Sequence, residues 1–154
     1  MGEVRPGETV LPFDPGEEAA AGLAFIGRIR SPWTDTATCP KNIGRARDTG
    51  RAAHVDLDPR YAPGLAVGQP IILIYWMDRG RRDLIVQRPG HADGPRGTFA
   101  LRSPMRPNLL ALSTVRITGI EGARIDIDAI DCLDGTPLVD IKPWLETVDL
   151  PPAG

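Results

Sequence analysis

Two arginines and two prolines fall within one short stretch of the sequence, LRSPMRPN (residues 101–108). A guanidinium group binds carboxylate or phosphate through forked, charge-assisted hydrogen bonds. Proline fixes φ and removes a backbone donor, so the stretch interrupts helix and strand alike and holds its side chains in fixed directions. The pattern predicts a stiff cationic loop that binds an anionic group. Its candidate side chains are Arg102, Ser103, Arg106 and Asn108.

A second stretch whose polar side chains could bind a ligand is CLDGTPLVDIKPW (residues 132–144). Asp134 and Gly135 form a dipeptide typical of a tight turn, and Thr136 supplies a hydroxyl. Asp140 and Lys142 are two residues apart, which places them on one side of a strand. The stretch therefore predicts carboxylates that accept hydrogen bonds from an ammonium or hydroxyl group.

Two further proline-containing loops are RSPW (residues 30–33) and CPKNIGRARD (residues 39–48). Each of the four loops alone is typical of a rigid corner in a β-structure, but the four together predict one site at the strand ends. We expect the substrate to be bound by Arg30, Lys41, Arg45 and Arg106.

Length and composition exclude several classes of protein. The 154 residues suit one domain, and the longest apolar run, PIILIYWM (residues 70–77), is too short to cross a membrane. The first twenty residues lack a signal-peptide pattern, so we expect a cytoplasmic protein. Two cysteines and two histidines are too few for a structural metal site, and we expect no metal. The sequence lacks G-x-G-x-x-G, P-loop and G-x-S-x-G motifs.

Charge is unevenly distributed along the sequence. Residues 79–106 contain seven arginines against two aspartates, whereas residues 121–149 contain eight acids against two basic residues. These segments are either solvated surface or a basic groove that faces an anionic ligand. A net charge of −2 and an aromatic content of 5% argue against a surface that coats nucleic acid.

Short apolar or alternating segments, separated by 17 glycines and 16 prolines, predict an all-β fold: a single irregular β-barrel with few short helices. Residues 70–77 predict a central strand, apolar on both faces and joined by a turn at residues 78–81 to a strand at 82–88. Residues 108–113 are compatible with one helical turn. We expect a flexible leader (1–21), one barrel domain (22–150) and a frayed tail (151–154). The remaining predicted strands cover residues 23–30, 52–57, 111–120, 123–131 and 136–141.

The stretches GTFALRSPMRPN and LDGTPLVDIKPW resemble two signature motifs of the TrmO (TsaA-like, YaeB-like) family of S-adenosylmethionine (SAM)-dependent tRNA methyltransferases. IGRIRSPW and YWMDR resemble the opening and the middle strand of the same family. The resemblance extends from Phe25 to Asp149. It implies a SAM-binding β-barrel that acts as a homodimer and methylates the exocyclic nitrogen of threonylcarbamoyladenosine beside the tRNA anticodon.

The same resemblance carries site residues over to this sequence. Arg102 or Arg106 would pair with the methionyl carboxylate of SAM or with an RNA phosphate, and Asp134 or Asp140 would take a ribose hydroxyl, the α-ammonium or a proton. We assign catalytic roles to Arg102, Asp134, Asp140 and Lys142. Cofactor binding is assigned to Arg102, Ser103, Pro104, Arg106, Pro107, Asn108, Leu133, Asp134, Gly135, Thr136, Asp140, Ile141, Lys142 and Pro143.

The sequence also departs from the family pattern. Asp78 stands where a histidine is common, the histidine usual before the central strand is missing, and Leu109-Leu110-Ala111 replaces Pro-Ile-Gly. The cofactor motifs are therefore kept better than the middle of the domain. The alternatives are a SAM-dependent small-molecule methyltransferase, a non-catalytic SAM-binding protein and, more weakly supported, an oligonucleotide-binding barrel.

Overall fold

The structure is a computed structural model that describes residues 3–61 and 64–154, so the first two residues of the expected leader lie outside the described residues. The chain forms two compact units, each of which is described by itself. The smaller unit combines residues 1–23 with 76–111, and the larger unit combines residues 24–75 with 112–154. The expected division into leader, single domain and tail stays a prediction.

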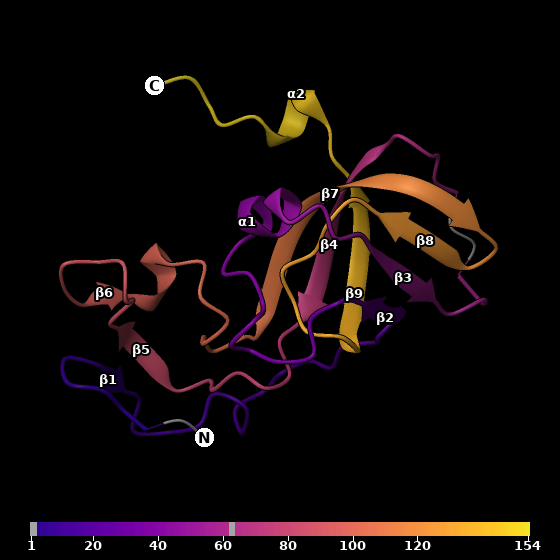
Figure 1. The fold of residues 1–154 in the computed structure, drawn as a ribbon. Helices are drawn as coiled ribbons and strands as arrows, with labels where there is room; N and C mark the ends of the chain where they lie inside the picture. Colours follow the sequence, from indigo (N-terminus) through magenta and orange to yellow (C-terminus); the bar gives the residue numbers. More distant parts are fainter. Residues whose placement is uncertain (1–2, 62–63) are drawn as a thin grey trace. The chain divides into compact units, whose positions relative to one another are not determined.

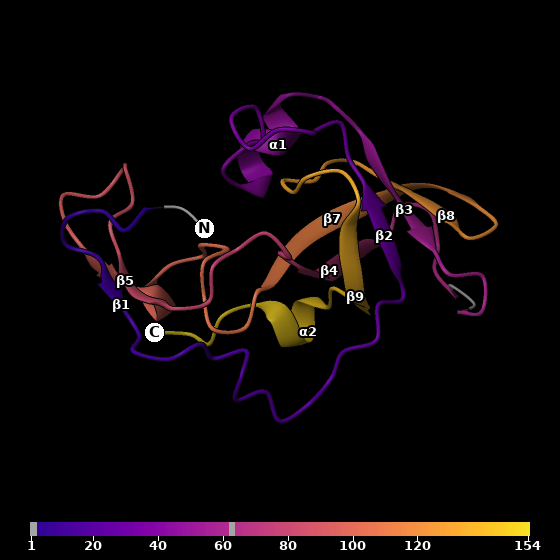
Figure 2. The same ribbon diagram turned by 90° about the horizontal axis from the view of Figure 1, so that it is seen from below.

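Six antiparallel strands close into a barrel, which confirms the predicted all-β class (Figure 1). Around the barrel the strands follow the order β2-β3-β8-β7-β4-β9, and Figure 2 shows β2, β3 and β8 side by side from below. The helices of the described chain are short: α1 (Ile43–Asp48) and α2 (Glu146–Asp149). The barrel strands are β2 (Gly27–Arg30), β3 (Ala53–Leu57), β4 (Pro70–Trp76), β7 (Leu110–Glu121), β8 (Arg124–Ile127) and β9 (Thr136–Pro143).

Branched aliphatic side chains fill the barrel. Ile29 pairs with Val55 across β2 and β3, and Val55 pairs with Ile125 across β3 and β8. All three side chains are fully buried, and each such burial contributes about 1.5–3 kcal/mol. In β8 isoleucine alternates with aspartate, a pattern typical of a strand with one solvated face: Ile125 and Ile127 are buried while Asp126 is half-buried.

The two faces of strand β4 differ in burial. Ile71, Leu73 and Tyr75 face the core, whereas Ile72 and Ile74 are only half-buried. A closed barrel has one interior, so a strand in its wall buries a single face completely. The strand is apolar on both faces, as predicted, and lies between β7 and β9, but only the face toward the barrel interior is fully buried.

The smaller unit carries a separate three-stranded sheet in the order β1-β5-β6. It contains β1 (Thr9–Val10), β5 (Leu84–Gln87), β6 (Arg96–Gly97) and the 3₁₀ turn η1 (Thr98–Ala100). The predicted strand at residues 82–88 exists as β5, but it pairs with β1 and β6 rather than forming a hairpin with β4. Residues 110–113 belong to β7, so the helical turn proposed for residues 108–113 was also wrong.

Helix α1 lies in the connection between β2 and β3. The Asn42 side chain caps it by accepting a hydrogen bond from the Arg45 backbone N–H (2.9 Å). Only Ala46 of the helix is buried, so the segment carries almost no apolar periodicity. A helix this short is stable only in its tertiary context, which explains why the sequence did not predict it.

Candidate functional site

The loop at residues 101–108 is held by a side chain of its own. Arg106 Nη1 donates hydrogen bonds to the Leu101 carbonyl (3.0 Å) and the Ser103 carbonyl (3.2 Å). The Ser103 hydroxyl accepts a hydrogen bond from the Met105 N–H (3.2 Å). The half-buried Arg106 side chain is therefore part of the structure of the loop, in addition to being a candidate ligand-binding residue.

Two side chains from the β5 region fix the second half of the same loop. Gln87 Nε2 donates to the Met105 carbonyl (2.6 Å), and Arg82 Nε donates to the Pro107 carbonyl (2.6 Å). The Arg82 guanidinium also lies over the Trp76 ring, 5.6 Å from its centroid. With the bonds from Arg106, every second carbonyl from residue 101 to residue 107 accepts a side-chain donor, so the loop has a defined shape.

Other residues of the same loop are exposed to solvent. Arg102, Pro104 and Asn108 are exposed, while Ser103 and Pro107 are half-buried. Because side chains already hold the backbone of this loop, a ligand that binds its exposed residues would cost little conformational entropy of the loop.

The turn at Asp134-Gly135 has the predicted geometry. Gly135 has a φ of +81°, a conformation that favours glycine, and its N–H donates to the Ile29 carbonyl (2.9 Å). Thr136 Oγ1 donates to the Leu133 carbonyl (2.7 Å), so the Thr136 hydroxyl completes the turn. Leu133 and Ile141 are half-buried, and Pro143 is exposed at the end of β9.

Asp134 joins two of the four proline-containing loops. Its carboxylate accepts a hydrogen bond from the Ser31 N–H (3.1 Å), and its own N–H donates to the Trp33 carbonyl (2.7 Å). The Ser31 hydroxyl donates to the Cys132 carbonyl (2.7 Å). The larger unit therefore brings RSPW and LDGTP together, and Asp134 acts in that junction.

Arg30 lies beside this junction. Its Nε donates to Asp56 Oδ2 (2.9 Å), and its Nη1 lies 4.0 Å from Asp134 Oδ2. All three side chains are more than 40% exposed, so water screens these pairs. An exposed, weakly held guanidinium can exchange its partner for an anionic ligand.

Asp140 and Lys142 lie next to each other on β9, as their spacing predicted. Lys142 Nζ is 3.1 Å from Asp140 Oδ2, and the Ile141 N–H donates to Asp140 Oδ1 (2.9 Å). Their side chains are 46% and 60% exposed. The pair offers a carboxylate and an ammonium to a ligand in solution.

Lys41 and Arg45 belong to the loop and helix between β2 and β3. Lys41 Nζ donates to the Thr36 carbonyl (3.3 Å), whereas the exposed Arg45 contributes its backbone N–H to the helix cap. Lys41 and Arg45, like Arg30, lie in the larger unit, and Arg106 lies in the smaller unit.

The two motif loops fall in different units. Residues 101–108 belong to the smaller unit, and residues 132–144 belong to the larger unit. That the two loops close around one ligand stays a prediction.

A buried polar cluster escaped the sequence analysis. The Tyr75 hydroxyl donates to Asp131 Oδ1 (2.9 Å), Ser113 Oγ donates to the same oxygen (3.0 Å), and the two hydroxyls are 2.9 Å apart. Burial, and then the Asp131 charge, raise the pKa of Tyr75. The three residues come from β4, from β7 and from the segment before the Asp134 turn, and no local motif connects such distant positions.

Cys39 lies under the electrostatic influence of the same carboxylate. Burial, and then Asp131, raise the pKa of Cys39 to about 11, while Lys41 lowers it. Burial also raises the pKa of Cys132. Neither thiol is therefore prepared to act as a nucleophile at neutral pH.

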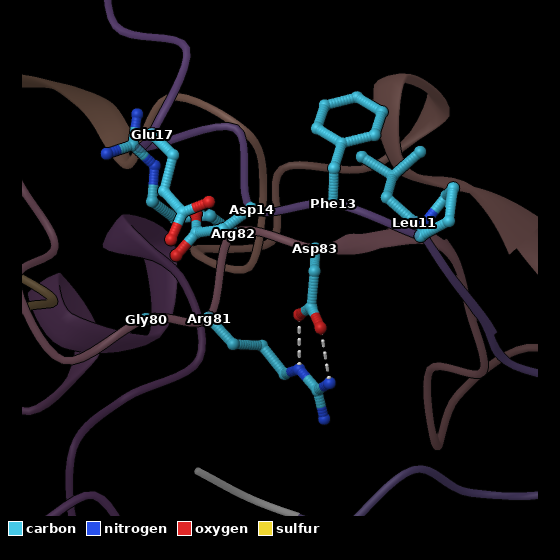
Figure 3. Close-up of a pocket in the computed structure, with 9 residues that line it drawn as sticks. Leu11, Phe13, Asp14, Glu17, Gly80, Arg81, Arg82 and Asp83 are labelled. Carbon is cyan, nitrogen blue, oxygen red and sulfur yellow. Dashed lines mark hydrogen bonds and ion pairs between the residues drawn. The ribbon is translucent and has the colours of Figure 1, made fainter.

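A cavity of about 490 Å³ lies within the smaller unit, between residues 11–17 and the turn before β5 (Figure 3). Most of its polar groups already have partners. Arg81 pairs with Asp83 (2.7 Å), Asp14 accepts from the Gly16 N–H (2.7 Å), and Arg82 holds the Pro107 carbonyl. The cavity is thus lined both by residues of the leader and by Arg82, which holds the 101–108 loop.

Residues 3–61 and 64–154, the described part of the chain, lack two other kinds of site. That part of the chain contains no group of three or more His, Cys, Asp or Glu residues placed to hold a metal ion. It also contains no helix with the length and apolar character needed to span a membrane.

Comparison with known proteins identifies related sequences. A probable S-adenosyl-L-methionine-binding protein, VirR, from Rhizobium radiobacter is 33% identical over 130 residues, covering 82% of this chain and 73% of the relative. An S-adenosyl-L-methionine-binding protein from Archaeoglobus fulgidus is 37% identical over 131 residues, covering 82% of this chain and 91% of the relative.

Solved structures of TrmO share the fold. One crystal structure of TrmO superimposes with a TM-score of 0.68 at 29% identity, covering 85% of this chain and 60% of that protein. TrmO from Pseudomonas aeruginosa gives a TM-score of 0.65 at 27% identity, with 85% and 58% coverage. The chain therefore spans about three fifths of the length of these TrmO proteins. Residues 28–150 match the family described as the tRNA-methyltransferase O N-terminal domain, and the chain belongs to this family.

Proposed function

We propose that this protein binds SAM and transfers its methyl group to the exocyclic nitrogen of threonylcarbamoyladenosine beside the tRNA anticodon. Membership of the tRNA-methyltransferase O family over residues 28–150 carries the proposal. Relatives named as SAM-binding proteins, which this chain matches over about four fifths of its length, support the choice of cofactor.

The residues of the two motif loops fit the chemistry of SAM. The cofactor presents a carboxylate, an α-ammonium group and two ribose hydroxyls to a protein. The exposed Arg102 can bind the carboxylate of the cofactor. Ser103 and Asn108 add neutral polar groups on the first loop, whereas the buried Thr136 hydroxyl completes the turn of the second loop.

When bound, SAM supplies a methyl group activated by the positive sulfonium. The remaining task of the chain is to align donor and acceptor and to keep water away. Side chains that brace four carbonyls of the 101–108 loop, with prolines at residues 104 and 107, give the rigidity that such alignment needs.

The acceptor nitrogen must also lose a proton. We assign that proton to the Asp140 carboxylate, with Lys142 as its positioning neighbour at 3.1 Å. Asp134 has both its backbone N–H and its carboxylate engaged with the RSPW loop, so we assign it to holding that loop. Arg30, Lys41, Arg45 and Arg106 are the proposed contacts to tRNA phosphates.

The proposal includes a homodimer, as the family resemblance implies, and the cytoplasmic location expected from the sequence. Sedimentation analysis of the purified protein tests the dimer.

Calorimetric titration with SAM is the first test of the proposal. Binding at micromolar to millimolar concentrations is expected, and an absence of heat up to millimolar SAM would contradict it. The protein is then incubated with SAM and with tRNA from cells that lack this methyl group, and the nucleosides are analysed by mass spectrometry. A gain of one methyl group on threonylcarbamoyladenosine is expected. Binding of SAM without any methylated nucleoside would instead indicate a SAM-binding protein without turnover.

Substitution separates the proposed roles. Asp140→Asn is expected to lower kcat by about a hundredfold, within the range for loss of a general base, while the Kd for SAM changes less. Asp58→Asn is the matched control, because Asp58 is also an acid paired with a basic residue two positions away. Equal activity of the two variants would remove Asp140 from the mechanism.

A further inference from the structure

Phe99 is unusually exposed for its type. Its side chain is 73% exposed, the highest value among the described large apolar residues. The two other phenylalanines of the chain, Phe13 and Phe25, are 45% and 47% exposed. Phe99 occupies the centre of the 3₁₀ turn η1, directly before the 101–108 loop.

The backbone under Phe99 is firmly anchored. Thr98 is 1% exposed, and its hydroxyl donates to the Leu84 carbonyl (2.7 Å) while accepting from Gln87 Nε2 (2.9 Å). The Leu101 N–H closes the turn on the Thr98 carbonyl (3.1 Å). With its neighbour Thr98 locked in the interior, Phe99 is held in an outward position.

The Gln87 side chain also connects the turn η1 to the 101–108 loop. The same amide nitrogen that donates to Thr98 donates to the Met105 carbonyl (2.6 Å). The Phe99 backbone is consequently fixed relative to the loop that carries Arg102 and Asn108. An aromatic ring displayed on such a platform, next to cationic and amide side chains, matches the requirements of a flat heteroaromatic ligand.

We propose that Phe99 provides a stacking face for a purine or pyrimidine base bound at the 101–108 loop. The inference rests on the proposed function, which supplies two sources of such a base: the adenine of SAM and a base of the tRNA substrate. Phenyl rings stack on bases through their π-faces, and an aliphatic side chain of similar size does not replace that contact.

Three variants of the full-length protein test the inference. Phe99→Ala removes the side chain, Phe99→Leu keeps apolar bulk without a flat face, and Phe99→Tyr keeps the ring. For each variant, the Kd for SAM is measured by calorimetry, and the KM for tRNA and kcat are measured in the methylation assay. Phe25→Ala serves as the matched control in the larger unit, and thermal melting and elution volume are followed throughout.

We expect Phe99→Ala and Phe99→Leu to weaken one ligand by about tenfold, with Phe99→Tyr and Phe25→Ala within about twofold of the wild type. A change confined to the Kd for SAM assigns the ring to the cofactor adenine, whereas a change confined to the KM for tRNA assigns it to an RNA base. Unchanged values in all variants would overturn the inference. Full activity of Phe99→Leu would also overturn the inference, because an apolar side chain without a flat ring would then be sufficient. A smaller oligomer in Phe99→Ala would overturn it too, because the ring would then contact a second copy of the chain.

Failure of the proposed function is distinguishable from failure of this inference. If the wild-type protein neither binds SAM nor methylates tRNA, the proposed function fails, and Phe99 is then tested with single-stranded oligoadenylate. Weaker oligoadenylate binding by Phe99→Ala and Phe99→Leu would support stacking on a base, and identical binding by all variants would exclude it.

Discussion

At the scale of single residues, the two arginines of the 101–108 loop have different environments. Arg106 donates to two carbonyls of its own loop and is half-buried, whereas Arg102 is exposed. A sequence pattern treats them as equivalent cations. The structure shows that Arg106 shapes the loop and that Arg102 is the more exposed of the two.

Arg106→Ala should therefore affect stability. The Leu101 and Ser103 carbonyls share one charged donor, Arg106 Nη1, and a hydrogen bond to a charged group is worth about 1.5–3 kcal/mol. We expect the free energy of unfolding in urea to fall by about 2 kcal/mol. Arg102→Ala is the comparison and should weaken SAM binding with a smaller effect on unfolding. If Arg106→Ala unfolds at the wild-type urea concentration, the two bonds contribute nothing to the fold.

The two thiols give a second prediction at this scale. Because the pKa of Cys39 is raised from 9.0 to about 11, its thiolate fraction at pH 8 is roughly a hundredfold lower than that of an unperturbed thiol. Alkylation by iodoacetamide should be correspondingly slow at pH 8 and should accelerate as the pH approaches 11. Unfolding in urea should restore an ordinary rate. Rapid alkylation of the folded Cys132→Ser variant at pH 8 would contradict the burial of Cys39.

At the scale of elements, the turn between β4 and β5 packs closely against the 101–108 loop at Gly80. A Cβ atom on Gly80 would lie 2.9 Å from both the Pro104 carbonyl oxygen and Leu109 Cδ2. The first of these is a backbone atom of the braced loop, so it cannot give way without moving the loop. Glycine at this position is thus required by close approach.

Gly80→Ala is expected to displace the loop and to destabilise the protein by about 1–3 kcal/mol, the usual effect of overpacking. Affinity for SAM should fall in parallel because the loop carries proposed cofactor contacts. Gly90→Ala in the same unit is the control, since nothing lies within 4 Å of its Cβ position. Equal urea midpoints for the two variants would show that the turn tolerates the added methyl group.

The leader is tied to the smaller unit through a second element contact. Strand β1 pairs with β5, and Glu8 accepts hydrogen bonds from the Arg5 side chain, the Arg5 N–H and the Arg88 N–H. The bonds to Arg5 are the main cause that lowers the pKa of Glu8 from 4.5 to about 2. That residues 1–21 are flexible stays a prediction, and these contacts define where to test it.

A lowered pKa in the folded state means that the ionised Glu8 stabilises the fold above pH 4.5. This contribution is lost progressively as the pH falls from about 4.5 to about 2. Hydrogen exchange of the β1 and β5 amides, measured between pH 6 and pH 2.5, should show protection falling in that window. Glu8→Gln should remove this pH dependence while Glu3→Gln retains it. The same pH dependence in both variants would assign the effect to other carboxylates.

At the scale of the whole molecule, tertiary structure redistributes charge. Residues 79–106 alone are strongly basic, but the smaller unit also contains the acidic leader, and the unit has eight arginines and eight acids. The larger unit has ten basic residues and twelve acids. The basic segment is therefore neutralised within its own unit, which disfavours a strong nonspecific attraction to RNA.

Removing acidic charges from the leader should strengthen the attraction of the basic segment (residues 79–106) to RNA. In the double variant Asp14→Asn, Glu17→Gln the smaller unit loses two negative charges, so its net charge rises by two, and tRNA binding at low salt should tighten by roughly fivefold with a steeper salt dependence. The double variant Glu121→Gln, Glu146→Gln changes the total charge equally but in the larger unit. Filter binding across a salt series compares the two. Equal tightening in both would show that total charge matters and its placement does not.

The all-β class, the positions of most strands and the family motifs could be predicted from the order of amino acids alone. These features are local: the alternation of Ile125 and Asp126 reports one buried face, and the prolines of the 101–108 loop restrict φ wherever the loop lies. The partners of Asp134 and Arg106 were not determined in this way, because hydrogen bonds to carbonyls leave no pattern in sequence spacing.

Which groups from distant parts of the chain meet became known from the three-dimensional fold. Tyr75, Ser113 and Asp131 share their hydrogen bonds across 38 and 56 residues, and β5 pairs with the leader although it follows β4 in the chain. Strand pairing and buried polar contacts depend on how the whole chain closes. The free energy of that closure is a sum over all elements, so no single segment encodes it.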